Sequence, residues 1–300
     1  MLILNESRDM LLNRTKQCGE DKFQRLKSII LKIIDENKFV RAAIQRHAED
    51  SMITSNMVIN ICCGDWSYSK PDDNSIGIGM DNVYRSSYLL MYLKCNACMQ
   101  FFKSLSTPFD IYYDSHKAKD IQKIIVQTGL GEESDVILQL HYSNYLSSFN
   151  SSSDLILTKS LSFLLFHEIG HLIHDPYILE SCPMTRERIA DAFAFEALMS
   201  GHNNPNNVNY LGALLAVGQM LLSRSQDEEI EDIEHPHSIE RMYELFRFWN
   251  VPDNSPYWEI AFCIIKDWGE KYHQDLTWIK ESSLSFKDKV NDAYEHFRKK

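Results

Sequence analysis

The spacing of apolar residues changes along the chain and predicts two kinds of structure. Over residues 20–50 apolar positions recur every three or four residues, which predicts helix. A helix is also expected at 83–105. Other short runs are rich in β-branched and aromatic residues and lie between turn-forming segments, so they predict strands. These runs are MVINICC (57–63), SIGIGM (75–80), FDIYYD (109–114) and VILQLHY (136–142).

Helical spacing dominates after residue 150. Ser151 to Asp154 offer side chains that can cap a long apolar helix at 155–174, which ends before Pro176. Further helices are expected at 184–200, 210–224, 237–249 and 256–273. The predicted fold class is therefore α+β, with a sheet-containing N-terminal region (1–150), a mostly helical C-terminal region (151–300), and both in one compact unit.

The longest predicted helix carries metal-binding side chains at its junction with the first region. FLLFHEIGHLIHDP (163–176) places His167 and His171 four residues apart, with Glu168 beside the first histidine. Residues four apart share one helix face, so both imidazoles can reach one zinc ion. Glu168 is rotated by about 100°, beside the ion, where it can act as a general base. Gly170 costs a helix about 1 kcal/mol and favours close approach of another segment.

A catalytic zinc site needs a third protein ligand, and the next predicted helix offers acids. In TRERIADAFAFEAL (185–198), Glu187 is the preferred third ligand. Asp191 lies four residues later on the same face and can hold a liganding imidazole through its second nitrogen. Glu196 is the competing ligand, and His174 is expected to cap the helix end rather than bind metal.

Composition limits the partners and the compartment. The net charge of −11 argues against a nucleic-acid partner. The first residues do not resemble a signal peptide, and the best apolar run, 210–222, is shorter than the roughly 18–20 residues of a membrane span. The 7 cysteines are irregularly spaced and fit free thiols, so we expect a cytoplasmic protein. Cys95 and Cys98 fit buried thiols better than a zinc ribbon, and the acidic run at 227–234 is expected to be solvated.

The segments HEIGH and ERIAD together resemble the gluzincin metallopeptidases. That resemblance implies that Glu187 is the third zinc ligand and that Asp191 supports a histidine. The form ExxAD is similar to the motif of the CAAX-protease and heat-shock membrane protease branch. Members of that branch also carry a downstream His-Pro followed by an arginine. Here these residues are His235, Pro236 and Arg241. The likeness implies that His235 reaches the oxyanion of the tetrahedral intermediate, whereas the residues alone fit a turn histidine before a helix equally well.

The expected absence of membrane spans separates the chain from that branch. In length and motif position it is similar to the family of the phage-exclusion protease Lit, cytoplasmic bacterial proteases that cleave a translation elongation factor. The resemblance covers residues 167–191 and 235–241. It implies a Zn²⁺ cofactor, a protein or peptide substrate, and regulation by an activating peptide or protein.

Metal-assisted peptide hydrolysis is the expected activity, with Glu168 as general base and His235 as oxyanion donor. An edge strand, with 136–142 as the candidate, is expected to hold the substrate extended. Two other hypotheses stay open. One is a metal-binding regulator, or a stress or phage-defence sensor, with conditional proteolysis; the other is a non-catalytic helical interaction protein with a coincidental motif.

Overall fold

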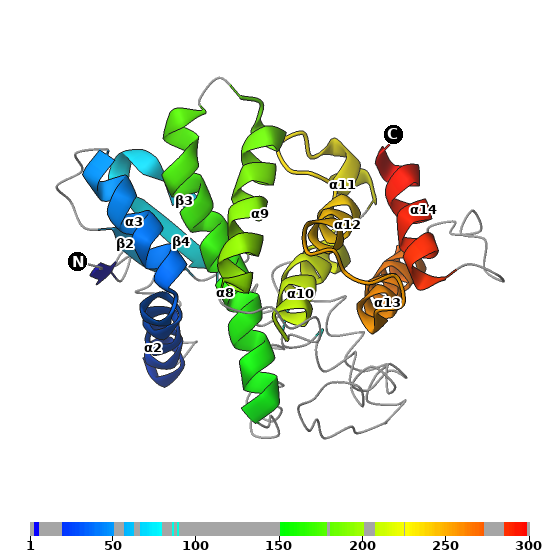
Figure 1. Ribbon diagram of the computed structural model, residues 1–300, viewed down its shortest axis with the longest axis horizontal. Helices are drawn as coiled ribbons and strands as arrows, with labels where there is room; N and C mark the ends of the chain where they lie inside the picture. The colour runs from blue at the N-terminus through cyan, green and yellow to red at the C-terminus, as the bar shows by residue number, and fades with distance from the viewer. Residues whose placement is uncertain are drawn as a thin grey trace.

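The fold joins a small sheet to a larger set of helices (Figure 1). The predicted elements at 83–105, 109–114 and 136–142 fall outside the described part of the chain except for Ser86 and Leu89, and Cys95 and Cys98 fall outside it as well. Within the described part, the α+β class with a mostly helical C-terminal half is confirmed. The computed structural model describes residues 3–5, 20–50, 57–62, 67–79, 86, 89, 151–178, 181–200, 208–224, 226–272 and 285–298.

Four short strands form one mixed sheet in the order β1-β2-β4-β3. The first three of these run parallel, and β3 is antiparallel to β4 at the edge of the described sheet. The runs predicted at 57–63 and 75–80 form β2 and β4, and Ile59 and Ile76 are fully buried there. The strands are β1 (Ile3–Asn5), β2 (Val58–Cys62), β3 (Tyr68–Lys70) and β4 (Ser75–Gly79).

The helices predicted after residue 150 are confirmed, and a further helix, α14, follows them. The helical structure predicted at 20–50 is confirmed, although the chain breaks at Asn37 into two helices, α2 and α3. The Asn37 side-chain oxygen accepts from the Val40 N–H at 3.0 Å, and its amide donates to the Ala197 carbonyl at 2.9 Å. The helices are α2 (Glu20–Glu36), α3 (Lys38–Asp50), α8 (Ser151–His174), α9 (Pro183–Met199), α10 (Val208–Ser223), α11 (Gln226–Glu231), α12 (Ser238–Phe248), α13 (Pro256–Lys271) and α14 (Phe286–Arg298).

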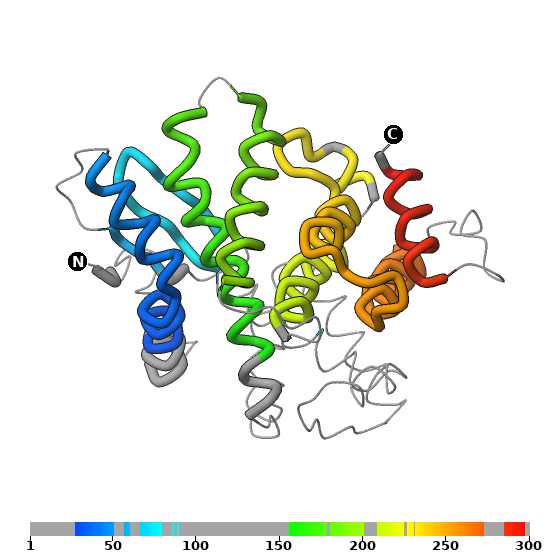
Figure 2. Tube along the Cα trace, viewed as in Figure 1, coloured from blue at the N-terminus to red at the C-terminus, as the bar shows by residue number. Residues whose placement is uncertain are grey.

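Helix α8 runs through the centre of the molecule, with the sheet, α2 and α3 on one side and the remaining helices on the other (Figure 2). Its apolar side chains are buried around most of its circumference; Phe163 and Leu165 are fully buried. By length and composition, Ile156–Tyr177 is apolar enough to cross a membrane. The sequence pattern had instead indicated 210–222 as the best apolar run. Its most apolar window is 78% buried inside the fold, which is the condition of a core helix.

The acidic run at 227–234 is mostly exposed, as the sequence predicts, but one of its acids, Glu229, is buried. Glu229 on α11 is 4% exposed, and its carboxylate accepts from the backbone N–H and hydroxyl of Ser238 at 2.7 and 2.8 Å. These bonds begin α12 beside the end of α11. These bonds fix the path of the segment between the two helices, and along this path His235 lies close to Glu187 of α9.

Candidate active site

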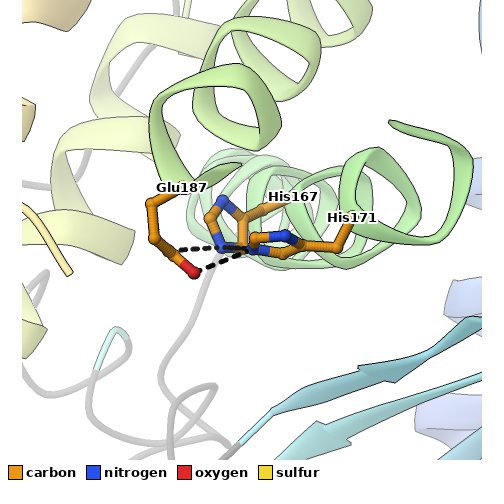
Figure 3. Close-up of side chains that lie close together, drawn as sticks. All are labelled: His167, His171 and Glu187. Carbon is orange, nitrogen blue, oxygen red and sulfur yellow. Dashed lines mark hydrogen bonds and ion pairs between the residues drawn. The ribbon is translucent and has the colours of Figure 1, made fainter. Parts of the chain in front are cut away.

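Two imidazoles and one carboxylate converge between α8 and α9 (Figure 3). The Nε2 atoms of His167 and His171 lie 3.2 Å apart. Glu187 reaches both: its Oε1 lies 3.0 Å from His171 Nε2, and its Oε2 lies 3.3 Å from His167 Nε2. All three residues are buried, with exposed fractions of 7%, 8% and 9%.

The spacing of these three groups fits a small tetrahedral ion. Zinc bonds of about 2.0–2.1 Å at tetrahedral angles place ligand atoms about 3.3 Å from one another. The three separations above, 3.0 to 3.3 Å, are close to that value, with the two Glu187 distances measured from its two carboxylate oxygens. Glu187 Oε2 is buried and accepts no hydrogen bond, so it lacks a polar partner, and a bound metal ion would supply one. The residues present therefore fit a divalent metal ion.

A close approach of the two helices brings Glu187 to the histidines. Gly170, between His167 and His171 on α8, faces Ala190 on α9. A Cβ atom built on Gly170 would lie 3.0 Å from the Ala190 Cα and 3.1 Å from its carbonyl oxygen. The sequence-based expectation that Gly170 admits a neighbouring segment matches this packing. The lack of a side chain here sets the separation between the two ligand-bearing helices.

Each imidazole has a carboxylate at its other nitrogen. Asp191 Oδ1 lies 2.9 Å from His167 Nδ1, and both Asp175 oxygens lie 3.2 Å from His171 Nδ1. A proton on Nδ1, donated to the carboxylate, leaves the Nε2 lone pair for a metal ion. Asp175 was read from the sequence only as part of the helix stop.

Arg241 on α12 completes the support of His167. Its Nε and Nη2 donate to the two oxygens of Asp191 at 2.8 and 2.6 Å, and the guanidinium is 5% exposed. Burial alone would raise the pKa of Asp191, but the Arg241 charge and the His167 hydrogen bond outweigh it and hold that pKa below its usual range. Asp191 therefore stays ionised and can hold the His167 ring in one orientation.

In the metal-free site, the imidazoles and Glu187 shift one another's pKa values. Burial opposes protonation of His171, but its hydrogen bonds to Asp175 and Glu187 prevail and raise its pKa to about 10. At Glu187, burial would raise the pKa, but the hydrogen bonds to His167 and His171 outweigh it and lower that pKa. Burial raises the pKa of Glu168, which is 8% exposed. A carboxylate whose pKa moves toward neutrality is better matched to general base catalysis.

His235 lies at the mouth of this site. Its Nε2 is 3.7 Å from Glu187 Oε1, and its side chain is 38% exposed. Asp232 fixes the ring from behind, with its oxygens 2.9 and 3.0 Å from His235 Nδ1, and also accepts from the His235 backbone N–H at 2.9 Å. Arg224 donates to Asp232 at 2.7 Å. The sequence indicated His235 through its His-Pro context but gave no signal for Asp232 or Arg224.

The predicted catalytic and metal-binding residues share one open cavity of about 380 Å³, whereas Asp191 lies behind His167 and does not line it. Ser67, Tyr68 and Ser69, at the start of the edge strand β3, form part of its wall. A larger cavity, of about 580 Å³, lies beside α2 and α3 and contains none of the predicted site residues. The members of the smaller cavity that matter for chemistry are His167, Glu168, His171, Asp175, Glu187 and His235.

Two sequence candidates lie outside the site. Glu196 is exposed on α9, so it is not the third ligand of this group. His174 lies in the last turn of α8, as expected. Its ring contacts Phe193 edge to face, with the centroids 5.7 Å apart, and burial lowers its pKa.

A comparison with protein families agrees with this geometry. The family model described as Peptidase U49 matches residues 147–261, a segment that contains α8, α9 and α12. No curated protein and no solved structure matches the chain. The matched segment covers just over a third of the 300 residues and includes every predicted site residue. This similarity to a peptidase family supports a protease, a hydrolase acting on peptide or protein substrates.

Proposed function

We propose that this chain is a zinc-dependent endopeptidase of the gluzincin type. One observation carries the proposal: two imidazole nitrogens and a carboxylate face one another at tetrahedral ligand spacing, beside the buried acid Glu168 and in an open cavity. His167, His171 and Glu187 would hold the ion. A bound zinc ion supplies a Lewis acid that polarises the scissile carbonyl and lowers the pKa of a water molecule.

The protein's own groups account for the proton transfers. Glu168 is buried beside the ligands and takes a proton from the attacking water, then passes it to the leaving amine. His235 presents its Nε2 to the cavity because Asp232 holds Nδ1, and a protonated ring in this position can donate to the oxyanion. Asp191 and Asp175 keep the two liganding rings oriented.

Strand β3 is placed to bind an extended substrate as an additional strand of the sheet. The candidate strand at 136–142 lies outside the described residues, but β3 is at the edge of the described sheet and contacts α8. Tyr68 and Ser69 of β3 also line the cavity. An extended peptide that pairs with β3 would lie across the site, with its main chain held by hydrogen bonds.

Exchange of Glu168 for glutamine tests the proposal. We expect Glu168→Gln to retain about one zinc ion per chain while peptide cleavage falls by at least about a hundredfold, since it removes the base and spares the ligands. Glu196→Gln makes the same change at an exposed position of α9 and should cleave as wild type. Cleavage of a proteome-derived peptide library can be read by mass spectrometry. Undiminished cleavage by Glu168→Gln would refute the scheme.

A further inference from the structure

The charged side chain that the scheme leaves unused is Arg186. It is partly buried, lies in the first turn of α9 directly before the ligand Glu187, and lines the cavity. Apart from the three histidines, the other charged groups on the cavity wall are acids. Glu168, Asp175 and Glu187 already have roles, and Glu234 is exposed at the rim.

Arg186 differs from the other arginines around the site in having no side-chain partner among the described residues. Arg241 pairs with Asp191 at 2.6 Å, Arg224 with Asp232 at 2.7 Å and Arg188 with Glu240 at 2.7 Å. Among the residues that the structure describes, no hydrogen bond or ion pair joins the Arg186 guanidinium. A partly buried charge loses some of its hydration, and here no described contact replaces it. Such a charge gains more from a ligand of opposite sign than a fully exposed charge does.

A structural role does not explain a cation in this place. The first turn of a helix carries the positive end of the helix dipole, where acids stabilise and cations do not. Helix α9 has no acid in its first turn, and Arg186 stands there beside the site. The local sequence therefore places positive charge where it opposes helix stability and faces the cavity.

We infer that Arg186 determines specificity by binding a carboxylate of the substrate close to the scissile bond. The inference rests on the proposed peptidase function. A guanidinium recognises a carboxylate through paired hydrogen bonds, and either an acidic side chain or the free C-terminus of a short peptide supplies that group. The preferred substrates are accordingly peptides with Asp or Glu near the cleavage point, or peptides that end close to it.

Binding and cleavage of matched peptide pools test this assignment. One pair of random pools carries Glu or Gln at a fixed central position, and a second pair ends in a free acid or an amide. Binding to the zinc-loaded Glu168→Gln protein is followed by fluorescence anisotropy, and cleavage by the wild-type protein is followed by mass spectrometry. The Glu and Gln pair reports a side-chain carboxylate, whereas the acid and amide pair reports a C-terminal one.

We expect the carboxylate pool of at least one pair to bind about tenfold more tightly than its neutral partner, a ratio equivalent to about 1.4 kcal/mol. Adding Arg186→Glu should abolish or invert that ratio. Adding Arg188→Glu makes the same charge change on the same helix but outside the cavity, and should leave the ratio unchanged.

Equal binding of the two pools in both pairs, no binding at all, or a preference that survives Arg186→Glu would overturn the assignment. Failure of the proposed function gives a different result: carboxylate pools bind selectively through Arg186, but the wild-type protein cleaves none of them.

Discussion

Replacing Gly170 by alanine tests how the two ligand-bearing helices are held together. In an isolated helix this change stabilises by about 1 kcal/mol. Here the new Cβ would lie 3.0 Å from the Ala190 Cα, 3.1 Å from the Ala190 oxygen and 3.3 Å from the Phe193 Cβ. Two of these contacts are backbone atoms of α9, which cannot move aside without moving the whole helix.

The two effects oppose each other, and the contact strain should prevail. Overpacking of a closely packed site costs about 1–3 kcal/mol, against a gain of about 1 kcal/mol from helix propensity. We therefore expect Gly170→Ala to lower the free energy of unfolding, measured by urea denaturation, by about 1 kcal/mol. A shift of a few tenths of an ångström at Glu187 exceeds the tolerance of zinc bonds, about 0.2 Å, so zinc affinity should fall about tenfold in a chelator competition titration.

Gly218→Ala provides the control, because it makes the same change in another helix. Its new Cβ would meet only side-chain atoms, the Ile264 Cδ1 at 2.9 Å and Cγ2 at 3.2 Å and the Leu89 Cδ2 at 3.2 Å, and such ends can rotate away. We expect zinc affinity to stay constant whatever the change in the free energy of unfolding, because these contacts lie on another helix and involve no atom of α9. If Gly170→Ala gains the full helix stabilisation and binds zinc like the wild type, the close approach does not position Glu187.

Three further changes probe the supporting groups. Asp191→Ala leaves Arg241 buried without its partner, so unfolding in urea should require about 3–5 kcal/mol less; a loss below 1 kcal/mol would contradict the buried pair. For the metal-free protein, the raised pKa of His171 contributes stability that is complete below its unfolded value of about 6.5. That stability disappears as the pH rises to about 10, so the melting temperature should fall across this interval; a constant melting temperature would count against the His171 pairings. Asp232→Ala removes the acceptor at His235 Nδ1, so kcat should fall about tenfold with little change in KM; an unchanged kcat would show that Asp232 does not position the ring.

The sequence predicted the helical half well, because long apolar helices leave a strong periodic signal. The sheet was harder to predict. Strands β1 and β3 have three residues each, too few for an alternating pattern, and neither was expected. The break between α2 and α3 was missed because the Asn37 cap depends partly on a carbonyl of Ala197, far along the chain.

The three proposed ligands were predictable for a local reason. Helix geometry places His167 and His171 on one face, and the next helix has only a few acids that can approach them. Their supporting groups were less visible. Asp232 lies in an acidic run that looks solvated, and the Asp191 to Arg241 contact joins residues 50 apart in sequence. Such partners are set by how helices pack, which a local pattern does not contain.

An anomalous-scattering map at the zinc edge, from crystals of the zinc-loaded protein, tests the central claim most directly. It should show one zinc ion per chain within about 2.0–2.2 Å of His167 Nε2, His171 Nε2 and a Glu187 oxygen. A zinc ion bound only elsewhere, or a zinc-loaded site in which Glu187 points away and another residue takes its place, would contradict the proposed centre.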